Sequence, residues 1–409
     1  MDDAHPTIAI KEIKKTNRQS EGEFLDTVET EVKTLEILRD RNHPHLIKAI
    51  AYYEMRNSHY LMFPWAGLGN LRNFWETEPP NIDETYLRWM FGQLSGLASA
   101  IAELHNYNKD SSYRHGDLKP ENILCFESSG TPGEELDGPC CLVIADVDLT
   151  KNHNKATEAR KTATRTMSGT IMYEPPETEI LKDKPRSRRY DIWSLGCIYL
   201  EFIIWLLYGP HELKRFVRDL GDYGRFYEFD SSKKPKLHKV VEAWADHIKK
   251  DSRCPTNTAL QQLLDIVMNQ LLNTDIGATP TIKRVSTTVL HRAATIQETD
   301  DDIPRSPTVL VRAPTELPLS GSPTSSCEDG RISAEKLSKK LCELYDTAIG
   351  KEGTKIKWMQ FDGKAQLGPD SRQYNSNLSE SDAKHPISAT LIKREVRQQL
   401  SELPTHEES

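Results

Sequence analysis

The sequence predicts an α+β protein built as two lobes, a small lobe with a reduced sheet over residues 1–66 and a mainly helical lobe over residues 67–296. Short runs rich in β-branched and aromatic residues gather near the start of the chain, at Thr7–Ile13, Leu46–Tyr53 and His59–Phe63. Most of the later segments instead carry apolar residues at helical spacing. A few strands followed by many helices are typical of the α+β class.

One helix is predicted within the small lobe. Ser20 and Glu23 form an S-x-x-E capping box directly before an apolar run. The apolar residues of that run recur at helical spacing and are Phe24, Val28, Val32, Leu35 and Leu38. We expect the helix to end near Asn42, because Pro44 follows.

The larger lobe should contain a second long helix, which begins near Asp83. One face of this helix is apolar and consists of Leu87, Met90, Leu94, Leu97, Ile101 and Leu104. Further along, Asn122–Phe126 and Cys141–Asp146 are predicted strands with a polar, turn-rich loop between them.

The run Ile192–Tyr208 is strongly apolar, and it could form either a core helix or a membrane span. We predict a buried core helix rather than a membrane span, because the run is shorter than a bilayer usually requires and contains Ser194 and Glu201. The first residues have no basic leader followed by an apolar run, so no signal peptide is expected. No membrane partner is therefore predicted.

Composition narrows the class of protein further. The formal net charge of the 409 residues is -8, which does not favour binding to nucleic acid. The seven cysteines include no C-x-x-C pair, so a reducing compartment is expected and the protein should be intracellular, either cytoplasmic or nuclear. The oligomeric state stays open.

The composition changes after residue 296. Residues 297–332 are rich in Pro, Ser, Thr and acidic residues, and they are predicted to form a disordered linker. Residues 333–409 are predicted to be a mostly disordered tail with one amphipathic helix over Ser333–Ile349.

The string HGDLKPEN over His115–Asn122 carries the clearest chemistry. Phosphoryl transfer needs a carboxylate at the attacking hydroxyl, a cation beside the moving phosphoryl group, and oxygen ligands for Mg²⁺. Asp117, Lys119 and Asn122 supply these three groups. The string resembles the catalytic loop of eukaryotic protein kinases of the serine/threonine type, and loosely the HGDLKPEN kinases of fungi. Gly116 replaces an Arg that often meets an activation-loop phosphate in this family, so activity is not expected to depend on such phosphorylation.

Asp146 ends an apolar strand and resembles the Asp of the D-F-G segment, which implies a second Mg²⁺ ligand. Val147 stands at the Phe position and Asp148 at the Gly position. The smaller Val147 should weaken an internal packing contact, and Asp148 adds negative charge beside the metal site.

Two later segments extend the resemblance. Residues 168–177 look like the end of an activation segment, in which Thr170 would touch the catalytic Asp and Glu177 would pair with a distant Arg. Thr279 stands at the position of that Arg, so Glu177 is expected to lack its ion pair unless Arg284 substitutes. Asp191 would cap the backbone of the catalytic loop.

Ala9-Ile10-Lys11 resembles the V-A-I-K strand of the family, which implies that Lys11 binds the α- and β-phosphates of ATP. Its expected partner is Glu31, which lies beside the apolar stripe of the first helix, and Glu29 is the competing choice. Phe63 and Trp65 fall in the segment that corresponds to the hinge beside the nucleotide.

The glycine-rich loop of the family has no counterpart. None of the ten residues before Lys11 is Gly, so the resemblance implies a domain truncated before the third strand. We expect a serine/threonine kinase that uses ATP and Mg²⁺ on a protein substrate. A pseudokinase or interaction module is the alternative, and a longer native chain that carries the missing strands is a third.

Overall fold

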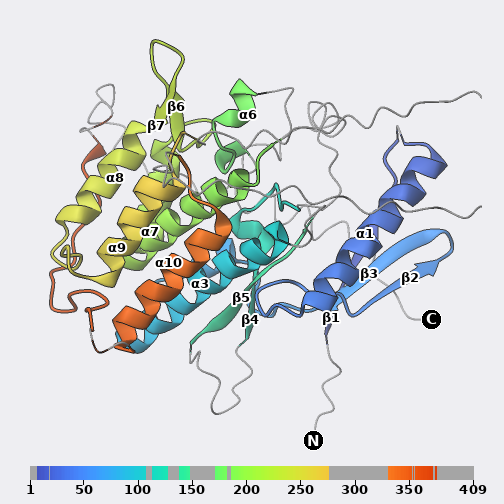
Figure 1. Cartoon of the computed structure of the whole chain (residues 1–409), viewed down its shortest axis with the longest axis horizontal. Coiled ribbons are helices and arrows are strands. Elements are labelled where there is room, and N and C mark those ends of the chain that lie inside the picture. Colours follow the sequence, from blue (N-terminus) through green and yellow to red (C-terminus); the bar gives the residue numbers. More distant parts are fainter. Residues whose placement is uncertain are drawn as a thin grey trace, which may run out of the picture.

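The computed structural model describes residues 7–17, 19–106, 113–127, 138–147, 171–181, 186–275, 330–351, 353, 355–371 and 374. Within these residues the chain forms a small sheet-containing lobe and a larger helical lobe (Figure 1). The α+β, two-lobed architecture predicted from the sequence is confirmed.

The small lobe is a three-stranded antiparallel sheet with one helix against it (Figure 1). The strand order is β1-β3-β2, and these strands are β1 (Ile8–Ile13), β2 (Ala51–Met55) and β3 (Ser58–Pro64). The prediction that the second strand starts at Leu46 is wrong. Leu46 instead forms an isolated bridge with Ile144 of the larger lobe, in which the N–H of Ile47 donates to Ile144 and the N–H of Ile144 donates to His45.

Helix α1 (Glu21–Arg41) has the predicted capping box, in which Ser20 and Glu23 each bond the other's backbone N–H. The helix ends at Asn42, which adopts a left-handed conformation with φ of 52°. The buried residues Phe24, Val28 and Leu35 face the core, so the helical spacing read from the sequence sets which side of α1 meets the sheet.

A two-stranded ribbon joins the lobes. It consists of β4 (Ile123–Glu127) and β5 (Cys140–Ile144), and Ile123 pairs with Ile144 in its register. The short helix α2 (Leu71–Phe74) lies before it in the chain, and a single 3₁₀ turn, Pro120–Asn122, leads directly into β4. The register therefore places residues 115–122 and residues 145–147 at the same end of the ribbon.

The helical lobe surrounds α7 (Arg189–Asp219), which changes direction at Gly209, where φ is 79° and Pro210 follows. Of the most apolar part of this helix, 94% is buried inside the protein, which confirms the prediction of a core helix. The other elements of this lobe are α3 (Glu84–His105), α6 (Glu177–Ile180), β6 (Tyr227–Phe229), β7 (Pro235–Leu237), α8 (Lys239–Lys250), α9 (Ala259–Ile266) and a π-helical turn (Val267–Leu271).

The predicted C-terminal helix is present as α10 (Ala334–Ile349), with Ser333 as its N-cap. It packs along α3 and so completes the helical lobe (Figure 1). The linker prediction is wrong for Gly330–Ile332, because the backbone N–H of Arg331 bonds to Asp275 and that of Ile332 to Gln270. Residues 276–329 lie outside the described residues.

The prediction of a mostly disordered tail is wrong for residues 355–371. Trp358 and Met359 are buried, and the backbone N–H groups of Ala259 and Leu260 bond to carbonyls of this segment at 2.8 and 3.0 Å. A few large apolar anchors are enough to hold a mostly polar segment, because each buries a large area.

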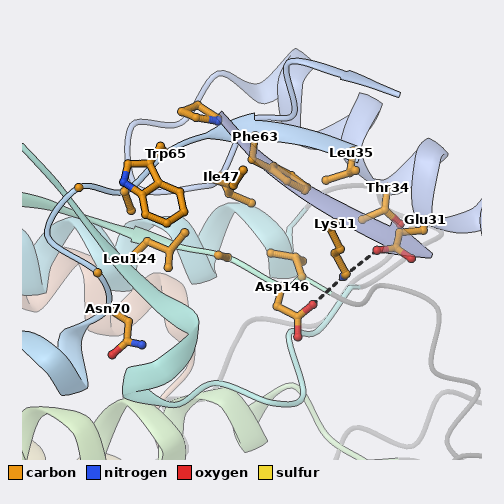
Figure 2. Close-up of a pocket in the computed structure, with 17 residues that line it drawn as sticks. Lys11, Glu31, Thr34, Leu35, Ile47, Phe63, Trp65, Asn70, Leu124 and Asp146 are labelled. Atoms are coloured by element: carbon orange, nitrogen blue, oxygen red, sulfur yellow. Dashed lines mark hydrogen bonds and ion pairs between the residues drawn. The ribbon is translucent and has the colours of Figure 1, made fainter. Parts of the chain in front are cut away.

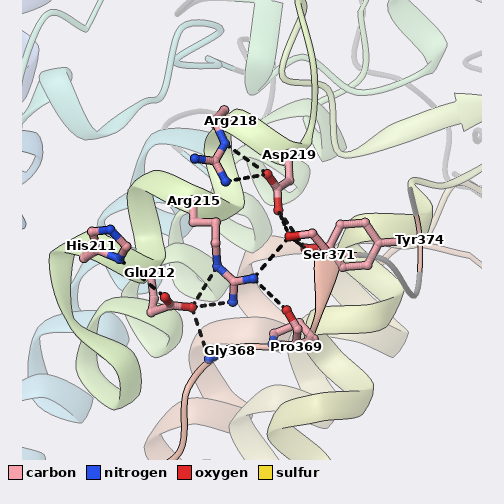
Figure 3. A network of polar contacts seen from close by, with 9 residues as sticks. All are labelled: His211, Glu212, Arg215, Arg218, Asp219, Gly368, Pro369, Ser371 and Tyr374. Atoms are coloured by element: carbon pink, nitrogen blue, oxygen red, sulfur yellow. Dashed lines mark hydrogen bonds and ion pairs between the residues drawn. The ribbon is translucent and has the colours of Figure 1, made fainter. Parts of the chain in front are cut away.

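The end of this segment is fixed by polar contacts with the last turns of α7 (Figure 3). Arg215 donates to the carbonyl of Pro369 at 2.7 Å and to Ser371 at 3.2 Å. Tyr374 donates to the carboxylate of Asp219 at 2.7 Å. The boundaries 1–66 and 67–296 stay predictions, but the packed helical lobe includes residues well beyond 296.

Candidate active site

A cavity of about 490 Å³ lies between the two lobes. One end is apolar, with Ile47, Phe63, Trp65 and Leu124, and the other end is charged (Figure 2). Phe63 and Trp65 both line the cavity, as expected for hinge residues, and Trp65 is 57% exposed at its edge. This arrangement suits a ligand with a flat apolar group at one end and a charged group at the other.

Lys11 forms the charged end with two carboxylates. Its Nζ lies 2.8 Å from Oε1 of Glu31 and 2.9 Å from Oδ1 of Asp146 (Figure 2). The competing Glu29 pairs with Lys33 one turn along α1. The structure therefore has the pairing with Glu31 that the helix spacing predicts. Burial alone would lower the pKa of Lys11, but Asp146 and Glu31 outweigh it and hold the pKa above its ordinary value.

Asp146 follows β5 with a left-handed backbone, at φ of 55°. Non-glycine residues adopt this conformation rarely and asparagine and aspartate most readily, so the sequence suits the turn. Val147 is buried and lines the cavity, so this position keeps a packing role despite its smaller side chain. Asp148 lies outside the described residues.

The loop His115–Asn122 is anchored by Asp191, which is fully buried in α7. Its carboxylate accepts hydrogen bonds from the backbone N–H groups of His115 and Gly116 at 2.9 and 2.8 Å, and contacts His105 Nε2 at 2.8 Å. Burial raises the pKa of Asp191, but His105 and these donors outweigh that effect and hold it below its ordinary value. The capping role expected for Asp191 matches this geometry.

Gly116 has φ of 75°, a left-handed conformation that favours glycine. The residue that stands in place of the family's Arg therefore also shapes the loop.

Asp117, Lys119 and Asn122 lie together, as the sequence predicts. Lys119 Nζ is 3.0 Å from the Asp117 carboxylate, and the Asn122 amide nitrogen donates to the Asp117 carbonyl at 2.8 Å. Both charged side chains are less than 20% exposed, at 19% and 17%. A carboxylate and an ammonium group are thus held side by side near the cavity.

Two hydrogen bonds join this loop to the Lys11 end of the cavity. His115 Nε2 lies 2.9 Å from the carbonyl of Ala145, and the N–H of Ala145 donates to the carbonyl of Asn122 at 2.9 Å. Asp146 follows directly, so the candidate base and the candidate phosphate-binding groups belong to one connected site.

Asn122 and Asp146 are the predicted metal ligands, and their chemistry fits a hard divalent cation. Because the Asn122 nitrogen is used as a donor to Asp117, its side-chain oxygen is oriented as an acceptor. Among the described residues no cluster of three or more His, Cys, Asp or Glu side chains suited to a metal occurs.

The expectation that Glu177 lacks an ion pair is wrong. Arg331 Nη1 and Nη2 lie 2.7 and 3.0 Å from its two carboxylate oxygens, and the guanidinium stacks over Trp193 at 5.0 Å. Arg331 is fully buried. The sequence analysis missed Arg331, which stands two residues before the N-cap Ser333 and 154 residues from Glu177. Thr170, Thr279 and Arg284 lie outside the described residues.

Sequence reasoning missed a partly buried polar network centred on Arg72. Its Nε donates to Glu121 at 3.2 Å, its Nη1 donates to Glu201 at 3.2 Å, and it also contacts Tyr173. Tyr173 donates to Glu201 at 2.6 Å. These contacts account for an acidic residue within the apolar run of α7, because Glu201 fixes α2 and the segment before α6 to the core.

The comparisons with known proteins agree with this site. The protein kinase domain family matches residues 2–288, so the chain belongs to the protein kinase family. Members of this family use ATP and a divalent metal ion and act on protein substrates.

Among similar proteins are the calcium/calmodulin-dependent protein kinase type 1 of Macrobrachium nipponense, 28% identical over 254 residues, 61% of this chain and 62% of that protein. Serine/threonine-protein kinase 33 of Bos taurus is 30% identical over 187 residues, 46% of this chain and 35% of that protein. Calcium-dependent protein kinase 6 of Plasmodium berghei is 32% identical over 201 residues, 48% of this chain and 12% of that protein. The chain thus spans less than two thirds of the length of each of these relatives.

Proposed function

We propose that this protein is a serine/threonine kinase that transfers the γ-phosphoryl group of ATP to a protein hydroxyl, with Mg²⁺ as its metal ion. The observation that carries the proposal is the connected site, in which His115 and Asn122 bond to Ala145 and so tie Asp117 to Lys11 and Asp146. The family match and the serine/threonine kinases among the relatives support it.

Each group in the site has a role that its position supports. Asp117 accepts the proton of the substrate hydroxyl, and Lys119 at 3.0 Å balances the negative charge around it. Lys11, held by Glu31, contacts the phosphates, while the apolar end of the cavity takes the adenine. Asn122 and Asp146 would hold Mg²⁺, which when bound neutralises phosphate charge.

Isothermal titration of Mg²⁺·ATP into the full chain, together with a phosphate-transfer assay, tests this proposal. Asp117→Asn should keep ATP binding but lose transfer by about 10²- to 10⁴-fold, because only the proton acceptor is removed. Lys11→Ala should weaken ATP binding itself. Lys33→Ala is the matched control, since Lys33 is an exposed α1 cation paired with Glu29, and it should change neither quantity.

Transfer that is equal in wild type and Asp117→Asn would refute the enzyme and favour the pseudokinase alternative, as would the absence of nucleotide binding. That alternative is kept because of three residues that depart from the family pattern in the sequence, Val147, Asp148 and Thr279. The intracellular localisation, and the absence of nucleic-acid and membrane partners, stay predictions.

A further inference from the structure

A second cavity, of about 380 Å³, is lined in part by the loop that carries Asp117. Its walls come from α2 and the two residues after it, from Glu121, from Met172, and from α7 beyond its bend together with the turn that follows. Among the described residues it shares no lining residue with the cavity between the lobes. Glu121 stands four residues after Asp117, so the second cavity opens beside the candidate base rather than beside the nucleotide.

Two buried polar atoms of the residues that line this cavity have no hydrogen-bond partner in the described part of the chain. They are Nε1 of Trp75, a donor, and Oε2 of Glu121, an acceptor. Both side chains contact Arg72, whose guanidinium carbon is 5.5 Å from the centre of the Trp75 ring and whose Nε donates to Oε1 of Glu121 at 3.2 Å. Buried polar groups without partners are unfavourable. A ligand that supplies both an acceptor and a donor would therefore be stabilised here.

The charges around Glu121 do not favour a basic ligand group. Arg72 already occupies Oε1 of Glu121, so the contact with both carboxylate oxygens that a second guanidinium prefers is not open to it. An ammonium ligand would come close to Arg72 and to the exposed Lys214. The other two carboxylates of the lining, Glu76 and Asp222, are exposed, so water and salt screen their charges. An uncharged polar group is the better match to this lining.

We propose that the second cavity binds a glutamine side chain of the protein substrate and so contributes to substrate selection, an inference that rests on the proposed kinase function. A carboxamide has an acceptor oxygen for Nε1 of Trp75 and a donor nitrogen for Oε2 of Glu121. Its methylene stem suits the apolar lining, which includes Leu213 and Val217. A hydroxyl also donates and accepts, but serine and threonine are shorter and leave more of this lining uncovered. An extended substrate advances about 3.3 Å per residue, so the glutamine would lie a few residues from the acceptor hydroxyl.

A series of peptides with one serine tests this selection on the full chain. A single glutamine is moved through the positions on both sides of the serine, and at each position it is also replaced by leucine, glutamate or arginine. Fluorescence anisotropy measures peptide binding, and a phosphate-transfer assay runs in parallel. At one position glutamine should improve both affinity and kcat/KM by about threefold to tenfold over leucine and arginine, which is the range expected for a hydrogen bond.

Trp75→Phe removes the indole N–H but keeps an aromatic ring, so it should weaken binding of the glutamine peptide by about threefold to tenfold and leave the leucine peptide unchanged. Trp244→Phe is the matched control. Trp244 is also buried, its Nε1 also has no partner among the described residues, and Arg215 also lies over its ring, at 5.1 Å. Because Trp244 does not line the second cavity, its replacement should leave the glutamine preference unchanged.

Lys214→Gln is a second variant, at an exposed position where folding is not at risk. Loss of this cation should improve binding of the arginine peptide by about twofold and leave the glutamine peptide unchanged. Equal binding of the glutamine, leucine and arginine peptides at every position, or a preference for arginine in the wild type, would overturn the inference. Phosphate transfer to those peptides would still uphold the proposed function. Glutamine-selective binding that Trp75→Phe abolishes, without any transfer, would support the cavity as a peptide site and count against the enzyme.

Discussion

Replacing Arg331 with methionine should remove the cation on which Glu177 depends. The side chains are 0% and 9% exposed, so the glutamate would be left as a buried charge without compensation. Removing one partner of a buried ion pair costs about 3–5 kcal/mol. The guanidinium also donates to the carbonyls of Asn273 and Arg189 at 3.0 and 2.9 Å. Those two bonds add about 1 kcal/mol each, so we expect a loss of about 5–7 kcal/mol in the free energy of unfolding.

Such a loss is a large part of the roughly 5–15 kcal/mol that stabilises most domains. Urea denaturation followed by tryptophan fluorescence measures it for Arg331→Met, Glu177→Gln and the double variant. The double variant should be more stable than the sum of the single losses predicts, by about 2–3 kcal/mol, because the two residues interact directly.

Lys339→Met serves as the control, since this α10 lysine is 78% exposed, and it should change stability by less than about 0.5 kcal/mol. The reasoning would be refuted by an Arg331→Met loss below about 1 kcal/mol, or by strictly additive effects at the two positions.

Three further changes test other parts of the structure. Gly116→Ala and Gly221→Ala both place a Cβ on left-handed backbone, and each should cost about 1–2 kcal/mol in the free energy of unfolding. Only Gly116→Ala should also lower phosphate transfer, because Asp117 follows Gly116. Equal transfer in both variants would contradict this. Trp358→Ala should cost about 3–5 kcal/mol in urea denaturation, against less than about 0.5 kcal/mol for the half-exposed Phe361→Ala. Burial, and after it the charge of His45, lowers the pKa of His43 to about 4. As the pH falls, this histidine therefore takes up its proton in the unfolded state before it does so in the folded state. The free energy of unfolding should decrease as the pH drops from about 6.5 towards 4. His43→Gln should therefore lose less stability than wild type between pH 7 and pH 5, and an equal loss would count against a partly buried, neutral histidine at this position.

Local patterns were enough to find most of the candidate site. The pairing of Lys11 with Glu31 follows from helical spacing, because a residue beside the apolar stripe must face the sheet. The grouping of Asp117, Lys119 and Asn122 follows from their short separation in the chain. Contacts of this kind depend on a few neighbouring residues, so one sequence can reveal them.

Contacts between distant segments could not be found in the same way. Glu177 and Arg331 are 154 residues apart, and the acidic, Pro-rich residues before Arg331 favoured a linker. Composition also hid the packed segment 355–371, because its fit depends on the buried Trp358 and on polar partners such as Arg215 (Figure 3). Polar residues of this kind look like solvated surface until a tertiary structure gives each one a partner.

The charged end of the cavity also limits how a nucleotide can enter. One ammonium group, that of Lys11, lies between the two carboxylates of Glu31 and Asp146, so the three groups together carry one net negative charge. A triphosphate alone would meet that charge unfavourably. A divalent cation that enters with the triphosphate could instead take Asp146 as a ligand and leave Lys11 to the phosphates and Glu31. The ion pair between Lys11 and Asp146 would then be replaced by two others, one between Asp146 and the metal ion and one between Lys11 and the phosphates. Nucleotide affinity should therefore depend on the metal ion.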